Sequence, residues 1–268
     1  MGAWRCSLRA LRKAERPGLH KALNGGDMRD IAAMLERAER FKADVDARLV
    51  KVQVADAGEH RVATSLFLTI AEEFAATLYL IRGGFSAHAP VVMKSMLEGL
   101  CGLLNLVKAP AYLDRMRYKD AAENIKLFTD YAADPDMAQD QEAVKTLLEW
   151  KAKAEPVLQE LSAKGVKAPK VLEDFKSAGM ANNYIAYRVY CAYAHNQLTT
   201  LLARHAGVPV LRYHEEAPVE STASLIASAV SVFGRAVQTL PKFTDANEAE
   251  LVEFLAVLDD DWEAFQDS

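Results

Sequence analysis

Cysteine is scarce in this sequence, and its placement excludes two common structural devices. The 268 residues contain three cysteines, Cys6, Cys101 and Cys191, and no two of them form a Cys-x-x-Cys pair. An odd number of widely spaced cysteines is untypical of a disulfide framework and of a zinc ribbon. The first residues also lack the long apolar core of a secretory signal. We therefore expect a protein of the reducing cytoplasm.

Long uninterrupted hydrophobic runs are missing as well. The most apolar segment, residues 89–107, contains Lys94 and Glu98. A membrane span would tolerate two charged side chains poorly, so this segment is interpreted as a core helix and no membrane contact is expected. The chain has neither a glycine-rich phosphate loop nor a nucleophile elbow, and we expect no cofactor.

Basic residues are unevenly distributed along the chain. The formal net charge of −5 argues against a surface that coats nucleic acid broadly, although it leaves room for a small basic site. Residues 1–24 carry six lysines and arginines against one glutamate, whereas residues 243–268 carry nine acidic residues and no basic one. We interpret residues 1–26 as a basic arm and residues 241–268 as an acidic last helix. Either both ends are simply solvated, or they attract each other within or between subunits.

Hydrophobic spacing predicts a protein built from α-helices. Apolar residues recur at intervals of three and four positions, and strand-like alternation is almost absent outside residues 208–214. We expect an all-α bundle of eight or nine helices in one domain, with residues 27–240 forming its core. The predicted helices span residues 27–55, 59–82, 90–108, 110–133, 137–163, 171–177, 184–204, 219–240 and 245–266.

The predicted helix 184–204 carries the main candidate site. Arg188 and His195 lie seven residues apart, which is close to two helical turns, so their side chains share one face. A permanent cation beside an imidazole can act on a phosphodiester, with Arg188 holding the phosphate and His195 moving the proton. In the alternative interpretation, Arg188 is a structural ion-pair partner and His195 is a core histidine with its hydrogen bonds made inside the protein.

Three more polar side chains flank this pair. Tyr184, Tyr193 and Asn196 are candidates for orienting a substrate, and the tyrosines for stacking on bases. The alternative for the tyrosines is core packing in which their hydroxyl groups reach hydrogen-bond partners.

A second polar set lies on the predicted helix 90–108. Lys94 and Glu98 interrupt an otherwise apolar run, where a charge is costly unless it is paired. Glu98 either pairs with Arg188 or orients His195, or it forms an intrahelical pair with Lys94. Gly99 and Gly102 leave room for a neighbouring helix to approach closely.

Metal binding is not expected. A di-iron carboxylate bundle uses Glu-x-x-His on two helices, and this chain contains no such motif. Glu72, Glu73, Glu98 and His195 are the side chains that could meet in a bundle core, but no second ligand lies one helical turn from His195.

Two segments resemble a known family. Residues 87–98, Ala-His-Ala-Pro-Val-Val-Met-Lys-Ser-Met-Leu-Glu, resemble the Arg-Ser-x-x-Glu helix of a family of uncharacterised, all-helical bacterial proteins. Tyr193-Ala194-His195 resembles the later histidine motif of that family. This chain has Lys94 where the family more often has arginine. The resemblance implies a helical fold and a domain of unknown function, without naming a reaction.

The spacing Arg188-x6-His195 is also similar to the Arg-x(4–6)-His signature of HEPN domains. These are small helical bundles, often RNA-cleaving toxins or defence effectors, in which a polar residue usually follows the arginine; here Val189 follows it. The resemblance implies a metal-independent endoribonuclease that binds RNA and forms a homodimer.

Two other classes of function fit the same sequence. One is a non-catalytic helical module that binds a protein partner, which the net negative charge would suit better than RNA. The other is a small-molecule sensor with a pocket lined by Tyr184, Cys191 and Glu98.

Overall fold

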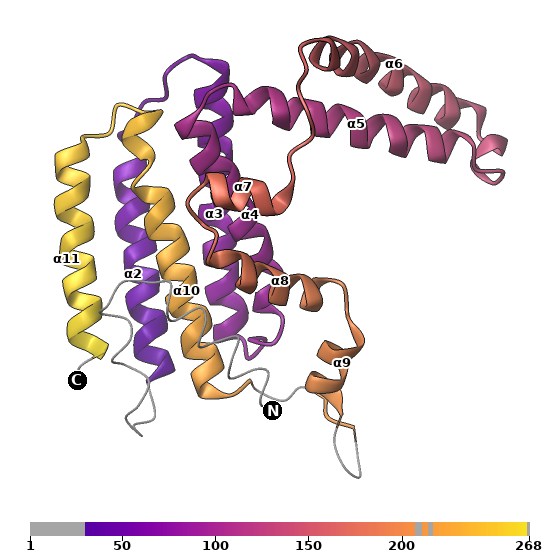
Figure 1. Ribbon diagram of the computed structural model, residues 1–268. Helices are drawn as coiled ribbons and strands as arrows, with labels where there is room; N and C mark the ends of the chain where they lie inside the picture. The colour runs from indigo at the N-terminus through magenta and orange to yellow at the C-terminus, as the bar shows by residue number, and fades with distance from the viewer. Residues whose placement is uncertain (1–29, 207–210, 214–216, 267–268) are drawn as a thin grey trace. The chain divides into compact units, whose positions relative to one another are not determined.

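The computed structural model describes residues 30–206, 211–213 and 217–266, so the predicted basic arm lies outside the described part (Figure 1). Within these ranges the regular structure is entirely helical, which confirms the predicted all-α class. The α-helices are α2 (Ile31–Leu49), α3 (Gly58–Arg82), α4 (Ala89–Lys108), α5 (Tyr112–Ala132), α6 (Gln141–Ala163), α7 (Val171–Ser177), α8 (Asn183–Ala194), α9 (Leu198–His205), α10 (Val219–Val237) and α11 (Glu248–Gln266), joined by the 3-10 turns η2 (Met137–Gln139) and η3 (Leu240–Lys242).

The described residues contain ten α-helices, whereas the sequence predicted eight or nine. The additional helix arises because the predicted helix 184–204 is divided into α8 and α9. Of the predicted extended segment 208–214, only residues 211–213 are described, and they belong to no regular element. The remainder of that prediction lies outside the described residues.

The chain divides into two compact units, of which the first comprises residues 1–107 and 175–268 and the second residues 108–174. This division does not test the prediction of a single domain, which stays a prediction. The predicted site residues all belong to the first unit: Lys94 and Glu98 lie before residue 108, and those between Tyr184 and Asn196 lie after residue 174.

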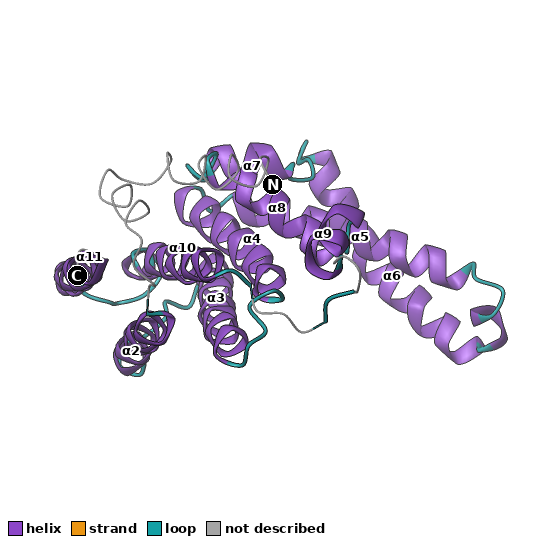
Figure 2. Ribbon diagram, turned by 90° about the horizontal axis from the view of Figure 1, so that it is seen from below, coloured by secondary structure: helices purple, strands orange, loops and turns teal. Residues whose placement is uncertain are grey.

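The core of the first unit is a cluster of phenylalanines between α2, α3 and α10, which lie side by side in both views (Figures 1 and 2). Phe233 of α10 stacks on Phe74 of α3 with ring centroids 4.6 Å apart and lies 5.1 Å from Phe41 of α2. Phe67 and Phe243 extend the cluster. All five rings are almost completely buried, so this cluster supplies a large share of the hydrophobic stabilisation of the unit.

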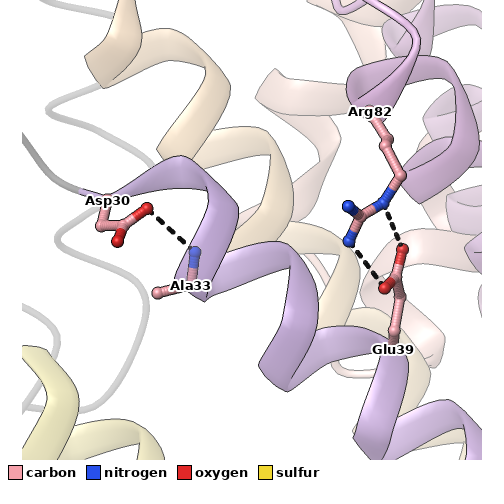
Figure 3. Close-up of polar contacts among 4 residues, drawn as sticks. All are labelled: Asp30, Ala33, Glu39 and Arg82. Carbon is pink, nitrogen blue, oxygen red and sulfur yellow. Dashed lines mark hydrogen bonds and ion pairs between the residues drawn. The ribbon is translucent and has the colours of Figure 1, made fainter.

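Polar contacts fix the ends of α2 and α3 (Figure 3). Asp30 caps α2, because its carboxylate accepts a hydrogen bond of 3.0 Å from the Ala33 amide. Arg82 in the last turn of α3 forms two hydrogen bonds of 2.8 and 2.7 Å with Glu39. Both partners are partly exposed, so solvent screens the pair and it contributes little to stability.

Helix α4 packs closely against α3. A Cβ atom at Gly99 would lie 3.1 Å from the Ile70 side chain, and Gly102 faces Leu66. The predicted close approach at these two glycines is therefore confirmed.

Three helices are long and apolar enough to cross a membrane by length and composition alone: α3, α4 and the segment Val219–Lys242. Their most apolar windows are 39%, 50% and 56% buried inside the protein. Helix α4 buries Met93, Met96 and Leu100 completely, as expected of the predicted core helix.

The second unit is a hairpin in which α5 and α6 run side by side (Figure 1). Phe128 of α5 packs on Trp150 of α6 with centroids 5.6 Å apart. Helix α6 continues through Pro156. Pro156 has no amide hydrogen to donate to the Ala152 carbonyl. Ala152 is exposed, so water can donate to this carbonyl instead.

Candidate functional site

The helix that carries the predicted site ends at Ala194, so the prediction of one helix over residues 184–204 is wrong. The Asn196 amide donates to the Tyr193 carbonyl at 3.2 Å, and the Gln197 amide to the Ala192 carbonyl at 3.0 Å. These two bonds form a Schellman motif, in which the residue after the cap adopts a left-handed conformation. Asn196 has φ +48°, a conformation that asparagine adopts more readily than most residues. This asparagine therefore ends α8 and sets the direction of α9.

We expect Asn196→Ala to destabilise the protein by about 1 kcal/mol, because alanine pays a steric penalty in the left-handed region. Asn196→Gly is the matched control, since it also removes the amide but adopts this conformation without strain. Urea unfolding followed by circular dichroism measures both. Equal destabilisation by the two substitutions would show that the side-chain amide, and not the backbone conformation, matters at this position.

Arg188 and His195 are both exposed to solvent. The Tyr184 hydroxyl, one turn earlier on α8, forms a hydrogen bond with the Arg188 guanidinium and raises its pKa above the usual value. Among the residues that the structure describes, no carboxylate lies within ion-pair distance of Arg188. Its positive charge is therefore available to an anion from solution.

His195 is the cap residue of α8, and its amide still donates to the Cys191 carbonyl at 3.0 Å. The backbone thus follows the helix as far as His195, and its Cα lies about 10 Å along the axis from that of Arg188. In the structure the Arg188 guanidinium bonds Tyr184, one turn back along the helix. It therefore reaches a phosphate beside His195 only after its side chain turns toward the C-terminal end of α8.

Glu98 contacts α8 through Tyr187, which was not among the predicted site residues. Lys94 Nζ donates to Glu98 Oε2 at 2.9 Å, which confirms the intrahelical alternative. The Tyr187 hydroxyl donates to the other carboxylate oxygen, Oε1, at 2.8 Å. Neither Arg188 nor His195 has a hydrogen bond or ion pair with Glu98 in the described part of the chain. The alternative in which Glu98 pairs with Arg188 or orients His195 is not observed, because Tyr187, on the buried face of α8, takes the second carboxylate oxygen.

Tyr187 keeps its proton in this position. It is only 8% exposed, and burial raises the pKa of its phenol far above the usual range, helped by hydrogen bonds with Cys191 and Glu98. The Lys94 ammonium lies 5.9 Å from the centre of its ring. Tyr187 is therefore a permanent hydrogen-bond donor that ties α8 to the carboxylate of α4.

Tyr184 belongs to an aromatic cluster with Tyr187 and Phe175, and the remaining tyrosines of α8 are partly or almost fully buried. Tyr184 stacks on Tyr187 at 5.9 Å and meets the buried Phe175 edge-on at 5.7 Å. Tyr193 is half-buried, and burial raises the pKa of its phenol, an effect that the nearby Arg204 partly offsets. Tyr190 is almost fully buried. This arrangement agrees with the core-packing alternative for the tyrosines.

A second carboxylate, Glu73 of α3, is close enough for its titration to be affected by the charge of Glu98. The sequence had indicated these two side chains only as candidates that could meet in a bundle core. Ser95 of α4 forms a hydrogen bond with the Glu73 carboxylate. Burial of Glu73 raises its pKa, the Ser95 hydrogen bond lowers it, and the charge of Glu98 raises it further. One carboxylate oxygen of Glu73 is shielded from solvent and has no hydrogen-bond partner among the residues that are described.

The raised pKa of Glu73 predicts a pH-dependent effect on stability. A carboxyl whose pKa is higher in the folded than in the unfolded protein favours folding below the unfolded pKa, near 4.5, and loses that contribution as pH rises through the folded pKa. We therefore expect Glu73→Gln to raise the melting temperature at neutral pH, with a gain that disappears near pH ~4. The exposed neighbour Glu72, changed to glutamine, is the control. A Glu73→Gln gain that is equal at both pH values would contradict the prediction.

No group of three or more His, Cys, Asp or Glu side chains in the described ranges is arranged to hold a metal ion. The hollow that the structure describes on the second unit, about 490 Å³ in volume, is lined mainly by α6 residues such as Val144, Leu148 and Ala152. None of the predicted site residues lines it.

Together these features define an all-helical protein in which α8 presents a solvent-exposed arginine and histidine and is tied to α4 by Tyr187 and Glu98. A family of unknown function (DUF5677) matches residues 60–208, more than half of the chain, and the protein belongs to this family. The matched residues run from α3 to α9 and include the whole site described above. No curated protein and no solved structure matches the chain. The expectation of an uncharacterised helical family is confirmed, while the HEPN-like signature and a bacterial origin stay predictions.

Proposed function

We propose that the protein is a metal-independent endoribonuclease of the defence or toxin type, acting in the cytoplasm through Arg188 and His195. The observation that carries the proposal is that both side chains are exposed on the same stretch of α8, and that Arg188 has no carboxylate partner in the described chain. A structural arginine in a core would need such a partner, because an unpaired buried charge is costly.

In this proposal the 2′-hydroxyl of the RNA attacks the adjacent phosphorus atom. His195 accepts the hydroxyl proton, and Arg188 donates hydrogen bonds to the non-bridging oxygens, on which negative charge accumulates. The bond to the 5′-oxygen breaks, and that oxygen takes up a proton from water. The products are a 2′,3′-cyclic phosphate and a free 5′-hydroxyl group, so no metal ion takes part in the step.

Lys94, Glu98 and Tyr187 have a positioning role in this proposal. Tyr187 immediately precedes Arg188, and its hydrogen bond to Glu98 fixes this turn of α8 against α4. Lys94 supplies a counter-charge to Glu98, so this carboxylate does not require Arg188 as its partner. The guanidinium is thereby left for the substrate.

The test is cleavage of a labelled single-stranded RNA by the purified full-length protein in the presence of a chelator. We expect cleavage with cyclic phosphate ends, and none of a DNA strand of the same sequence, because the 2′-hydroxyl is the nucleophile. A His195→Ala protein purified in parallel controls for contaminating ribonuclease. Equal activity, or equal inactivity, of the two proteins would contradict the proposal.

A second candidate, a helical module that binds a protein or a second copy of itself, is favoured by the surface of α9. Leu198 and Leu202 are 71% and 52% exposed, and Leu201 lies between them. Apolar side chains gathered on a short helix are typical of a contact surface, and a homodimer would bring two copies of α8 together. A titration of the His195 imidazole with an oligonucleotide, followed by NMR, separates the candidates, because a pure interaction module would show no response.

A further inference from the structure

A second cationic group, the guanidinium of Arg204, lies outside the pair of Arg188 and His195. Arg204, in the last turn of α9, forms a hydrogen bond of 3.0 Å from Nη2 to Nε2 of His88, the residue just before α4. His88 is exposed and Arg204 is half-buried. The Nε atom of Arg204 is shielded from solvent and has no hydrogen-bond partner in the described ranges of the chain.

The charge of Arg204 is not compensated by this contact. A guanidinium can only donate hydrogen bonds, so Nε2 of His88 is the acceptor and carries no proton. The imidazole therefore orients the guanidinium without supplying negative charge. Among the described residues no carboxylate forms an ion pair with Arg204, whereas the exposed Arg82 of the same unit is held by Glu39.

A partly desolvated guanidinium without a counter-charge favours the binding of an anion. Removing it from water has a free-energy cost that an anionic ligand offsets, and hydrogen bonds between charged partners are about twice as strong as neutral ones. The neighbouring start of the 20-residue helix α4 adds the positive end of a helix dipole. Both effects favour a compact, strongly charged ligand such as a phosphate group.

The position of Arg204 connects it to the site on α8. Its charge acts on the Tyr193 phenol, and Tyr193 is two residues before His195. Arg204 therefore lies near the end of α8 that carries the imidazole, while Arg188 is nearly two turns further back along the helix.

We propose that Arg204, oriented by His88, forms a second phosphate-binding site. In RNA cleavage this site holds the phosphate that flanks the scissile one, a role that rests on the ribonuclease proposed above. The guanidinium supplies the charge and the hydrogen bonds, and His88 is a positioning residue.

The first experiment tests the anion site without any RNA. Inorganic phosphate is titrated into the full-length protein, and the amide resonances of residues 86–89 and 203–206 are followed by NMR. We expect saturable shifts that are lost in Arg204→Met and are at least about tenfold weaker in Arg204→Lys, which keeps the charge but loses the planar fork. Arg82→Met is the matched control, because it removes the same charge and should leave phosphate binding unchanged. Absent or non-saturable shifts in the wild type, or equal binding by the wild type and Arg204→Met, would overturn the proposal.

The second experiment tests the role in cleavage. A dinucleotide with a single phosphodiester is compared with the same dinucleotide carrying an additional terminal phosphate. We expect Arg204→Met to raise KM for the phosphorylated substrate by about tenfold or more, with kcat unchanged and no effect on the unphosphorylated one. An equal KM effect on both substrates, or none on either, would overturn the flanking-phosphate role. Phosphate binding at Arg204 in a wild-type protein that cleaves no RNA would contradict the ribonuclease while leaving the anion site intact.

Discussion

Replacing His195 with alanine is expected to lower the rate of RNA cleavage by about 10²–10⁴-fold, the usual contribution of general acid–base catalysis. The imidazole is exposed and lies at the cap of α8, where its backbone amide makes the structural contact. The substitution should therefore leave the melting temperature almost unchanged. This separation of activity from stability distinguishes a catalytic histidine from one that supports the fold.

His205→Ala is the matched control for this substitution. His205 is also near a helix end, but its ring contacts the Arg212 carbonyl at 3.1 Å and has no assigned catalytic role. We expect this variant to cleave RNA at close to the wild-type rate. If His205→Ala loses as much activity as His195→Ala, the effect does not identify His195 as the proton carrier.

Substitutions of Arg188 and His195 are expected to lower the rate of RNA cleavage through the same step. Arg188→Ala removes the phosphate contact, and Arg188→Lys keeps a charge but loses the two-pronged hydrogen bonding, so we expect alanine to be the more damaging. The double variant Arg188→Ala with His195→Ala should cleave RNA only slightly more slowly than the less active of the two single variants. Residues that act in one step have non-additive effects on the rate. Fully additive losses would indicate that the two side chains act at separate places.

Phe233→Ala is expected to destabilise the protein by about 3–5 kcal/mol, the range for truncating a buried aromatic ring. Phe233 is completely buried and contacts Phe41, Phe67 and Phe74 on two other helices. Its removal would leave a cavity between α2, α3 and α10 that these rings cannot fill. Urea unfolding followed by tryptophan fluorescence measures the change in free energy.

Phe233→Leu is the control, because it keeps most of the buried volume and should cost less than about 1.5 kcal/mol if the core repacks around it. A Phe233→Ala cost below about 1 kcal/mol would show that α10 does not close this core. The result also bears on the family match, which ends at residue 208. Helix α10 lies beyond that boundary, yet it covers the apolar face of α3 inside it.

Much of the fold was predictable because a helix is indicated by apolar residues spaced three or four positions apart in the sequence. The predicted helix 59–82 differs from α3 by one residue at its start and ends at the same residue. The division of residues 184–204 was missed because apolar spacing continues through Asn196. A single residue in a left-handed conformation changes the chain direction without altering the hydrophobic pattern.

The partners of the charged side chains could be predicted only in part. Lys94 and Glu98 are one turn apart on the same helix, so their pairing follows from sequence. The hydrogen bond between Glu98 and Tyr187 spans 89 positions and depends on how α4 and α8 pack. The contact between Arg204 and His88 spans 116 positions and was not foreseen for the same reason.

The sequence by itself determined the helical class of this protein, the approximate extent of its helices, and the spacing of Arg188 and His195, because each of these depends on residues within a few turns of one another. Only the tertiary structure decided that these two side chains face solvent and that Tyr187 and not Arg188 takes the carboxylate of Glu98. It also decided that Arg204 has no carboxylate partner among the residues the structure describes. The physical reason is that burial and ion pairing depend on which helices meet, and no local pattern records which residues become neighbours once the helices pack.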